Sequence, residues 1–350
     1  MQATEIVLPG IGEPEALQVL TRELPPPGPA QALVRVEATG ISFAEQQMRR
    51  GKYYDQPRFP FVPGYDLVGV VEQLGGAQPP TAPAVGQRVA ALTKTGAWAD
   101  RVLLDAADLV PVPAGIDADQ AETVIVNGVT AWRMLHRTAR VQAGQTVVVL
   151  GAGGGVGSTL VQLARLAGAR VIGVAGPAQL DRVRYLGAVP VNYRGEDVSR
   201  RVRELAPEGV AAVFDHVGGP GIVESWRMLG RGGTLVSYGT AATRDVPGSP
   251  RLPVLRLIAR LIAWNLLPNG RRAAFFNVWA GRARRPDRYR AELRQDLGTV
   301  FALLAAGKIS AQIAGEFPLE QAAAALRHAE SGGLIGKVVL APNHSSSGGR

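Results

Sequence analysis

Cysteine is absent from this chain of 350 residues. Its absence excludes disulfides, cysteine nucleophiles and every metal site built on thiolates. The few histidines show no metal-ligand spacing either: His136, His216, His328 and His344. Long uninterrupted apolar runs are also lacking, which argues against a membrane-spanning helix. No basic segment followed by an apolar core comes after Met1, so we expect no secretory signal and a cytoplasmic protein.

Acidic residues are fewer than basic residues, and the formal net charge is +9. A basic balance can indicate a nucleic acid, an anionic lipid or an anionic cofactor as partner. The chain has no helix-turn-helix signature and no aromatic–basic RNA motif. We therefore expect no specific nucleic-acid partner.

Glycine is abundant, and one glycine-rich stretch lies between two apolar runs. The β-branched run 146–150 predicts a buried parallel strand, helical spacing follows from Val156 to Ala167, and a second apolar run covers 170–174. This strand–turn–helix–strand order is the context that a dinucleotide fingerprint requires. Glycines let the backbone approach a pyrophosphate, and the helix N-terminus offers amide groups to it. The residues expected to bind the cofactor here are Gly151, Gly153, Gly154, Gly155, Val156 and Gly157.

The rest of the chain falls into a β-rich part and an α/β part. Short apolar runs bounded by proline and glycine predict a mostly β domain in residues 1–120, with strands over 5–8, 32–38, 67–74, 87–92 and 101–104. Alternating strands and helices over 146–240 predict a doubly wound parallel sheet, with further strands over 189–193, 210–215 and 234–238. Beyond them we expect a strand over 275–279, helices over 288–306 and 319–330, a closing strand over 337–340 and a disordered tail over 343–350.

Five motifs make the chain similar to the medium-chain dehydrogenase/reductase superfamily, and to its zinc-free quinone oxidoreductase branch in particular. They are spread over residues 30–340: VPGYDLVG at 62–69, NGVTA at 127–131, the glycine turn at 151–157, NYR at 192–194 and GKVVL at 336–340. Gly151 stands where the family usually has alanine. The resemblance implies a GroES-like catalytic domain over 1–123, completed by 307–342, and a Rossmann NADP-binding domain over 124–306 with an insertion at 241–272.

The resemblance also implies an active site between the two domains, at the carboxyl ends of the parallel strands. Zinc-dependent relatives carry Gly-His-Glu where this chain has Gly64, Tyr65 and Asp66, and a ligand cysteine where it has Ser42. We therefore expect no metal. Tyr53 matches a tyrosine that borders the cleft in relatives, and it is our candidate for a polar substrate contact, together with Ser42. The alternative for Tyr53 is an aromatic side chain packed under a loop. His216 follows the expected fourth strand and could border the cleft, but a structural role is favoured.

The expected end of the second strand, at Ala175 and Gly176, carries no acid. An NAD site usually has one there for the ribose 2′-hydroxyl, and a carboxylate would repel a 2′-phosphate. Arginines that suit a phosphate follow nearby. We therefore predict NADP(H) as cofactor, although these arginines could also be solvated helix faces. The resemblance implies that Tyr193 lines the 2′-phosphate pocket and that Thr130 lies beside the nicotinamide. The other residues expected to bind the cofactor are Ala175, Arg182, Arg194, Tyr238, Gly239 and Lys337.

The apolar stretch 252–267 is interrupted by Arg256 and Arg260 and is too short and too charged to span a bilayer. Three interpretations stay open: burial against the cofactor domain or a second subunit, a lid over the substrate, or a membrane-surface helix. The vesicle amine transport branch has a similar apolar–basic segment, which is implicated in lipid contact.

Without zinc, no Lewis acid stabilises an alkoxide, which disfavours alcohol oxidation. Hydride addition to a conjugated acceptor needs less help because the charge spreads into an enolate or hydroquinone. We therefore predict an NADPH-dependent reductase of quinones or α,β-unsaturated carbonyls with a small hydrophobic substrate, acting as a homodimer. The alternatives are a dedicated enoyl reductase of a biosynthetic pathway, or a non-catalytic lipid-binding or regulatory protein that retains the cofactor fold. We also expect Gly154→Val to abolish cofactor binding in a folded protein, because a branched side chain would obstruct the pyrophosphate and disfavour any positive φ.

Overall fold

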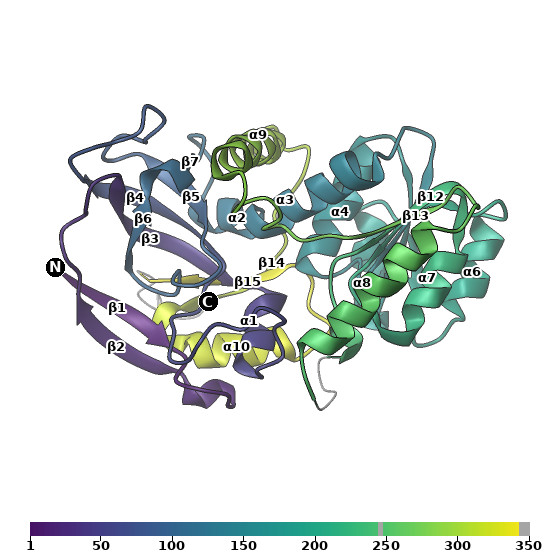
Figure 1. The fold of residues 1–350 in the computed structure, drawn as a ribbon, viewed down its shortest axis with the longest axis horizontal. Coiled ribbons are helices and arrows are strands. Elements are labelled where there is room, and N and C mark those ends of the chain that lie inside the picture. The colour runs from purple at the N-terminus through teal and green to yellow at the C-terminus, as the bar shows by residue number, and fades with distance from the viewer. Residues whose placement is uncertain (244–247, 343–350) are drawn as a thin grey trace. The chain divides into compact units, whose positions relative to one another are not determined.

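A computed structural model describes residues 1–243 and 248–342, so the tail expected over 343–350 lies outside the described residues. Contacts between residues divide the chain into two units (Figure 1). The N-terminal unit comprises residues 1–129, 281–332 and the stretch from 336 onward, and the central unit comprises 130–280 and 333–335. Helix α3 (Ile125–Trp132) contains the first boundary.

The N-terminal unit is built mainly from strands. Its strands are β1 (Gln2–Val7), β2 (Gln18–Glu23), β3 (Gln31–Ile41), β4 (Asp66–Leu74), β5 (Arg88–Leu92), β6 (Arg101–Asp105), β7 (Val110–Pro111), β14 (Ile313–Pro318) and β15 (Lys337–Ala341). Its helices are α1 (Phe43–Arg49), α2 (Ala118–Thr123), α9 (Pro286–Ala305) and α10 (Ala322–Glu330), with one-turn helices η1 (Pro14–Ala16), η2 (Ala106–Asp108) and η7 (Leu319–Gln321).

A seven-stranded sheet with the order β14-β15-β3-β4-β5-β7 forms the body of this unit, and β6 pairs with β3. Strands β14 and β15 run parallel and the other pairs are antiparallel. Alternate residues of β3, Ala32, Val34 and Val36, enter one core together with Leu67 and Val89. This period of two is the reason that the apolar runs near the N-terminus form strands.

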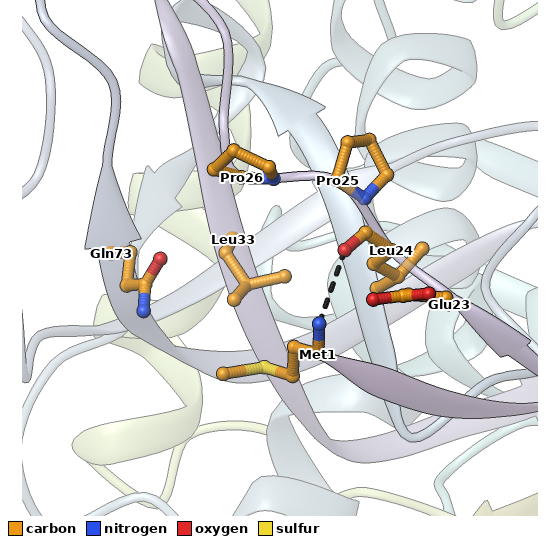
Figure 2. A pocket seen from close by; sticks show the side chains of 7 residues that line it. All are labelled: Met1, Glu23, Leu24, Pro25, Pro26, Leu33 and Gln73. Carbon is orange, nitrogen blue, oxygen red and sulfur yellow. Dashed lines mark hydrogen bonds between the residues drawn. The ribbon is translucent and has the colours of Figure 1, made fainter.

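Strands β1 and β2 pair only with each other. A hollow of about 500 Å³ opens beside them, and the side chains in Figure 2 line it. The Met1 ammonium donates to the Leu24 carbonyl there, at 3.3 Å. None of the expected site residues lines this hollow.

The central unit alternates strands and helices. Its strands are β8 (Thr146–Leu150), β9 (Arg170–Ala175), β10 (Val189–Asn192), β11 (Val210–Asp215), β12 (Leu229–Ser237) and β13 (Arg272–Phe275). Its helices are α4 (Gly155–Leu166), α5 (Leu180–Tyr185), α6 (Val198–Leu205), α7 (Ile222–Arg227) and α8 (Arg251–Asn265), the π-helical η3 (Arg133–Ala139), and the one-turn helices η4 (Pro177–Gln179), η5 (Gly219–Gly221) and η6 (Ala241–Thr243).

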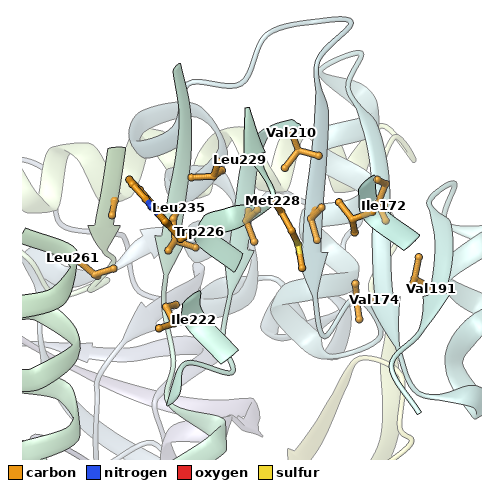
Figure 3. Close-up of a cluster of buried hydrophobic side chains, with 14 of the residues drawn as sticks. Ile172, Val174, Val191, Val210, Ile222, Trp226, Met228, Leu229, Leu235 and Leu261 are labelled. Carbon is orange, nitrogen blue, oxygen red and sulfur yellow. The ribbon is translucent and has the colours of Figure 1, made fainter. Parts of the chain in front are cut away.

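The six strands of this unit form one sheet with the order β10-β9-β8-β11-β12-β13, and all its pairs are parallel. The strand order therefore reverses between β8 and β11, which is the topological switch point of a doubly wound sheet. Helices α6, α7 and α8 contribute Val202, Trp226 and Leu257 to the core cluster on one face of the sheet. Figure 3 labels Trp226 of α7 and Leu261 of α8 among the side chains of this cluster. The α/β class predicted from the sequence is confirmed.

Helix α8 lies within the insertion at 241–272 and forms nearly half of it. Its inner face buries Val254, Leu257 and Leu261, and Trp264 stacks on Trp226 with ring centroids 4.9 Å apart. Burial against the cofactor unit is therefore one part of its role. Its outer face leaves Leu255 and Ile262 exposed. None of the helices in the described ranges has the length and apolar character needed to cross a bilayer.

Two sequence expectations need correction. The strand expected over 275–279 is wrong, since β13 ends at Phe275. The Asn265 side chain donates to the Ala273 carbonyl and accepts from the Ala273 amide, which holds β13 at an earlier position in the chain than expected. The Asn277 side chain accepts from the Trp279 amide and forms a turn after the strand. Helix α9 groups by contacts with the N-terminal unit, whereas the expected boundary at 306 put it in the cofactor domain. The ion pair of Arg290 with Asp108, at 2.7 Å, ties it there.

Candidate functional site

The glycine turn joins β8 to α4 at the switch point of the central sheet. Gly151 has a φ of +69°, a conformation that favours glycine. A Cβ on Gly157 would lie 2.0 Å from the Gly151 carbonyl oxygen, so only glycine allows this close approach. The Gly154 amide closes the turn by donating to the same carbonyl, at 3.0 Å. Helix α4 begins at Gly155, and its first turn offers amide groups to an anion.

The reason given for the Gly154→Val expectation is partly wrong. Gly154 is the N-cap of α4 with φ −73° and ψ 173°, an ordinary extended conformation. A Cβ there would meet only the Gly151 carbonyl oxygen, at 3.5 Å. A side chain at position 154 is therefore compatible with the turn, and any effect on a cofactor must come from obstruction.

The end of β9 lies beside the end of β10. Ala175 is buried, and its carbonyl accepts from the Tyr193 amide at 3.3 Å. The Tyr193 side chain is 53% exposed and lies within 3.5 Å of where a Cβ on Gly176 would be. The Arg194 guanidinium lies 5.7 Å from the centroid of the Tyr193 ring. Tyr193 and Arg194 thus place an aromatic ring and a cation near the end of β9.

Arg182 and the neighbouring acid Asp181 make their described contacts with other residues of α5. The Arg182 guanidinium lies 4.6 Å from the centroid of the Tyr185 ring on α5. Asp181 extends into solvent and pairs with Arg184 at 2.5 Å. The described contacts group Arg194 with Tyr193 and Arg182 with Tyr185.

Gln179 was not among the expected site residues. Its side-chain oxygen accepts from the Gly176 amide at 3.3 Å, and its amide nitrogen donates to the Leu334 carbonyl. Its amide group also fills the space next to Gly153, where a Cβ would lie 2.6 Å away. Gln179 thus connects the glycine turn with the end of β9. The sequence signal for this role was a polar residue three positions after Gly176.

The ends of β11 and β12 complete this edge of the sheet. Asp215 accepts from the amides of Val217 and Gly218 and from the Ser225 hydroxyl, at 2.7–2.9 Å. These bonds hold the loop after β11. The Tyr238 amide donates to the Asp215 carbonyl at 2.9 Å, and burial raises the pKa of the Tyr238 phenol. Gly239 passes the His216 backbone so closely that a Cβ would lie 2.6 Å from its oxygen.

Ser42, in the N-terminal unit, caps helix α1. Its hydroxyl accepts from the Ala44 amide at 3.1 Å and donates to the Glu45 carboxylate, which also accepts from the Ser42 amide at 2.9 Å. The spacing Ser-x-x-Glu was a readable capping-box signal. This structural use of the hydroxyl competes with the expected substrate contact.

Tyr53 and Tyr65 form a pair of buried phenols in the same unit. Their hydroxyl oxygens lie 2.9 Å apart, and the side chains are 8% and 6% exposed. Burial and the neighbouring phenols raise the pKa of Tyr53. Tyr53 therefore stays a neutral hydrogen-bond donor at physiological pH. Tyr65 occupies the position where zinc-dependent relatives carry histidine, and no local sequence pattern predicts its pairing with Tyr53.

Lys337, which was expected to bind the cofactor, lies in a buried charge cluster of the N-terminal unit. Its ammonium donates to both Asp66 oxygens, at 2.7 and 2.8 Å, and to Glu122. Burial alone would lower the pKa of Lys337, but the two carboxylates outweigh burial and raise it. All three ammonium hydrogens have acceptors within this cluster. Thr130, another expected cofactor residue, lies buried within α3.

The donor set at the positions of the zinc ligands does not fit zinc. Tyr65 and Ser42 stand there, and both hydroxyls are engaged as described above. Among residues 1–243 and 248–342, no three His, Asp or Glu side chains gather in a way that could hold a metal ion. We therefore derive no chemistry through a metal.

Comparisons with known proteins agree with this two-unit architecture. Residues 28–114 match the model of the alcohol dehydrogenase GroES-like domain, and residues 186–340 match that of the zinc-binding dehydrogenase family. The human synaptic vesicle membrane protein VAT-1 homolog is 29% identical over 96% of this chain and 86% of that protein.

Two further matches come from bacteria. The phthioceranic/hydroxyphthioceranic acid synthase of Mycobacterium tuberculosis is 32% identical over 94% of this chain, which spans only 15% of that protein. The structure of the Escherichia coli quinone oxidoreductase in complex with NADPH superposes with a TM-score of 0.84, with 27% identity, 97% of this chain and 100% of that chain covered. With both domain models matched in order along one chain, the protein belongs to the medium-chain dehydrogenase/reductase superfamily.

Proposed function

We propose that this protein is an NADPH-dependent, zinc-independent reductase that transfers hydride to a quinone or an α,β-unsaturated carbonyl compound. One observation carries the proposal: a glycine turn at the switch point lies next to the end of β9, where Ala175 and Gly176 carry no carboxylate and Tyr193 and Arg194 lie nearby. The likeness to a quinone oxidoreductase solved with NADPH supports it.

The central unit would hold the cofactor. The turn from Gly151 to Gly157 and the first amides of α4 would bind the pyrophosphate, because close backbone approach and a helix N-terminus suit an anion. Tyr193 and Arg194 would form the pocket for the 2′-phosphate, with the guanidinium as a charge-assisted donor. The backbone at Tyr238 and Gly239 would border the nicotinamide. Bound NADPH would supply the hydride.

Tyr53 would serve the acceptor molecule. Reduction of a conjugated carbonyl places negative charge on its oxygen, and a neutral donor in a dry site stabilises that charge. Since its pKa is raised, the Tyr53 phenol keeps its hydrogen, and Tyr65 orients it through the 2.9 Å contact. Ser42 is the weaker candidate because its hydroxyl caps α1. Homodimerisation stays a prediction, which light scattering of the purified protein would test.

Two alternatives have their own support. The match to a segment of a biosynthetic synthase favours a dedicated enoyl reductase. The exposed apolar side chains of α8 beside Arg256 and Arg260, with the likeness to a vesicle membrane protein, favour a lipid-binding protein that retains the cofactor fold.

Turnover separates these possibilities. We would follow the absorbance of NADPH with a panel of quinones, enones and enoyl thioesters, and measure flotation with vesicles of phosphatidylcholine and phosphatidylserine in parallel. We expect NADPH consumption with quinones or enones. Consumption with enoyl thioesters alone would favour the biosynthetic alternative. No consumption with any acceptor, alongside vesicle binding, would overturn the proposal.

A further inference from the structure

His216 lies at the switch point of the central sheet. It is the first residue after β11, and Gly151 is the first residue after β8. The imidazole covers Gly151 so closely that a Cβ there would lie 2.4 Å from the ring carbon Cε1. The ring thus takes the space that a methyl group would need, in a turn where the family usually has alanine. It lies at the edge where a dinucleotide crosses a doubly wound sheet.

One ring nitrogen is already fixed by the fold. Nδ1 lies 3.1 Å from the Leu150 carbonyl oxygen, and because a carbonyl can only accept, Nδ1 carries the hydrogen. Burial lowers the pKa of His216, although the Asp215 carboxylate and the Leu150 carbonyl oppose the shift. The other titratable group close to the ring is Tyr238, whose ring centroid is 6.1 Å away. In the neutral ring, Nε2 therefore presents a lone pair and acts as an acceptor.

The topology indicates which half of a dinucleotide would meet this acceptor. The adenosine ribose belongs at the end of the second strand, here β9, and the pyrophosphate at the N-terminus of α4. The other half then extends over the ends of β11 and β12. Phosphates only accept hydrogen bonds, so a neutral Nε2 has no favourable partner among them. The donors closest to the pyrophosphate in that half are the hydroxyls of the second ribose.

We infer that His216 is a cofactor-positioning residue, whose Nε2 accepts a hydrogen bond from a hydroxyl of the nicotinamide-side ribose. The inference rests on the proposed function, since it assumes that NADPH binds the central unit. Loss of one such bond weakens binding by about three- to tenfold. Fragments that lack the second ribose do not depend on it.

Two amide substitutions test the roles of the two ring nitrogens separately. His216→Asn places an amide nitrogen near the position of Nδ1, so it can keep the contact with Leu150 but has nothing at Nε2. His216→Gln reaches the position of Nε2 and can supply an acceptor there. We would measure the dissociation constants of NADPH and of adenosine 2′,5′-bisphosphate, which contains no nicotinamide ribose, for both variants and the unmodified protein. Thermal unfolding would check that each variant is folded.

We expect His216→Asn to weaken NADPH about three- to tenfold, to leave the bisphosphate unchanged, and to be rescued in part by His216→Gln. Unchanged NADPH affinity in a folded His216→Asn protein would overturn the inference. Equal weakening of both ligands would also overturn it, since that result indicates a distorted loop. Failure of the unmodified protein to bind NADPH would instead defeat the proposed function and the inference with it.

Discussion

At the scale of single residues, the two candidate arginines differ in what they touch. Arg194 lies over Tyr193 at the end of β10, whereas Arg182 lies over Tyr185 on α5. A charge-assisted contact with a phosphate contributes roughly 1.5–3 kcal/mol, or about ten- to a hundredfold in affinity. We expect Arg194→Ala to weaken NADPH by this factor and NADH little.

Arg182→Ala is the matched control, and it should change both dissociation constants little and equally. Calorimetric titration of each variant with NADPH and NADH measures the four values. A loss of NADPH preference in Arg182→Ala, with Arg194→Ala unchanged, would place the 2′-phosphate against α5 instead.

The charge cluster of Lys337, Asp66 and Glu122 leads to a pH prediction. Burial, and then the Asp66 carboxylate, raise the pKa of Glu122 well above its usual range, although Lys337 lowers it in part. The folded protein therefore holds this proton to higher pH than the unfolded chain does. Stability from such a group is fully present below its ordinary pKa and is lost as pH rises through the folded value. We expect the free energy of unfolding to include a term that falls above about pH 4.5.

Glu122→Gln should remove that term and flatten the pH dependence of the free energy of unfolding above about pH 4.5, as measured by urea unfolding. Lys337→Met should behave differently and cost roughly 3–5 kcal/mol near neutrality, because it leaves the buried Asp66 carboxylate without its cation and the Glu122 side chain without its donor. If the free energy of unfolding depends on pH in the same way for the unmodified protein and for Glu122→Gln, Glu122 is ionised in both the folded and the unfolded state.

This cluster also marks a limit of inference from the sequence. Lys337 and Asp66 are 271 positions apart, and no local pattern predicts their contact. Lys337 was expected to bind the cofactor, while the fold gives its hydrogens acceptors in Asp66 and Glu122. The same limit applies to Tyr53 and Tyr65, whose hydroxyl contact depends on the path of the loop between them.

At the scale of elements, the glycine turn allows a matched pair of substitutions. Gly154→Val should leave the fold intact, because its neighbour lies at ordinary contact distance, and should abolish NADPH binding by obstructing the pyrophosphate. Gly157→Ala should destabilise the protein by about 1–3 kcal/mol, because its Cβ would overlap the Gly151 backbone and the turn must open. Urea unfolding and NADPH titration of both variants check this. A folded Gly154→Val protein with unchanged NADPH affinity would refute the assignment of the turn.

Elements with strong local signals were predictable. The strand β8, the turn and helix α4 follow from one contiguous pattern of β-branched residues, glycines and helical spacing. Strand β2 was missed because its residues are exposed and show no alternation of burial. Strand β13 was placed too late because the side chains of Asn265 and Asn277, rather than apolar periodicity, fix its ends.

At the scale of the whole molecule, motif order along the chain predicted the family and the two kinds of unit, and the comparisons confirmed both. The assignment of α9 to the N-terminal unit was harder to predict from the sequence, because it depends on contacts of Arg290 and Val300 with residues far earlier in the chain. The site residues within the central unit were predictable where they follow strand ends. His216 and Gln179 were not assigned to it, because their importance depends on which loops the sheet order brings together.

The most direct test of the account is the dissociation constant of the unmodified protein for NADPH compared with that for NADH, measured by titration under the same conditions. The end of β9 carries no acid and has Tyr193 and Arg194 nearby, which predicts that NADPH binds tighter by about ten- to a hundredfold. Equal affinities, or tighter binding of NADH, would contradict the cofactor assignment, and absence of binding by either would contradict the proposed function.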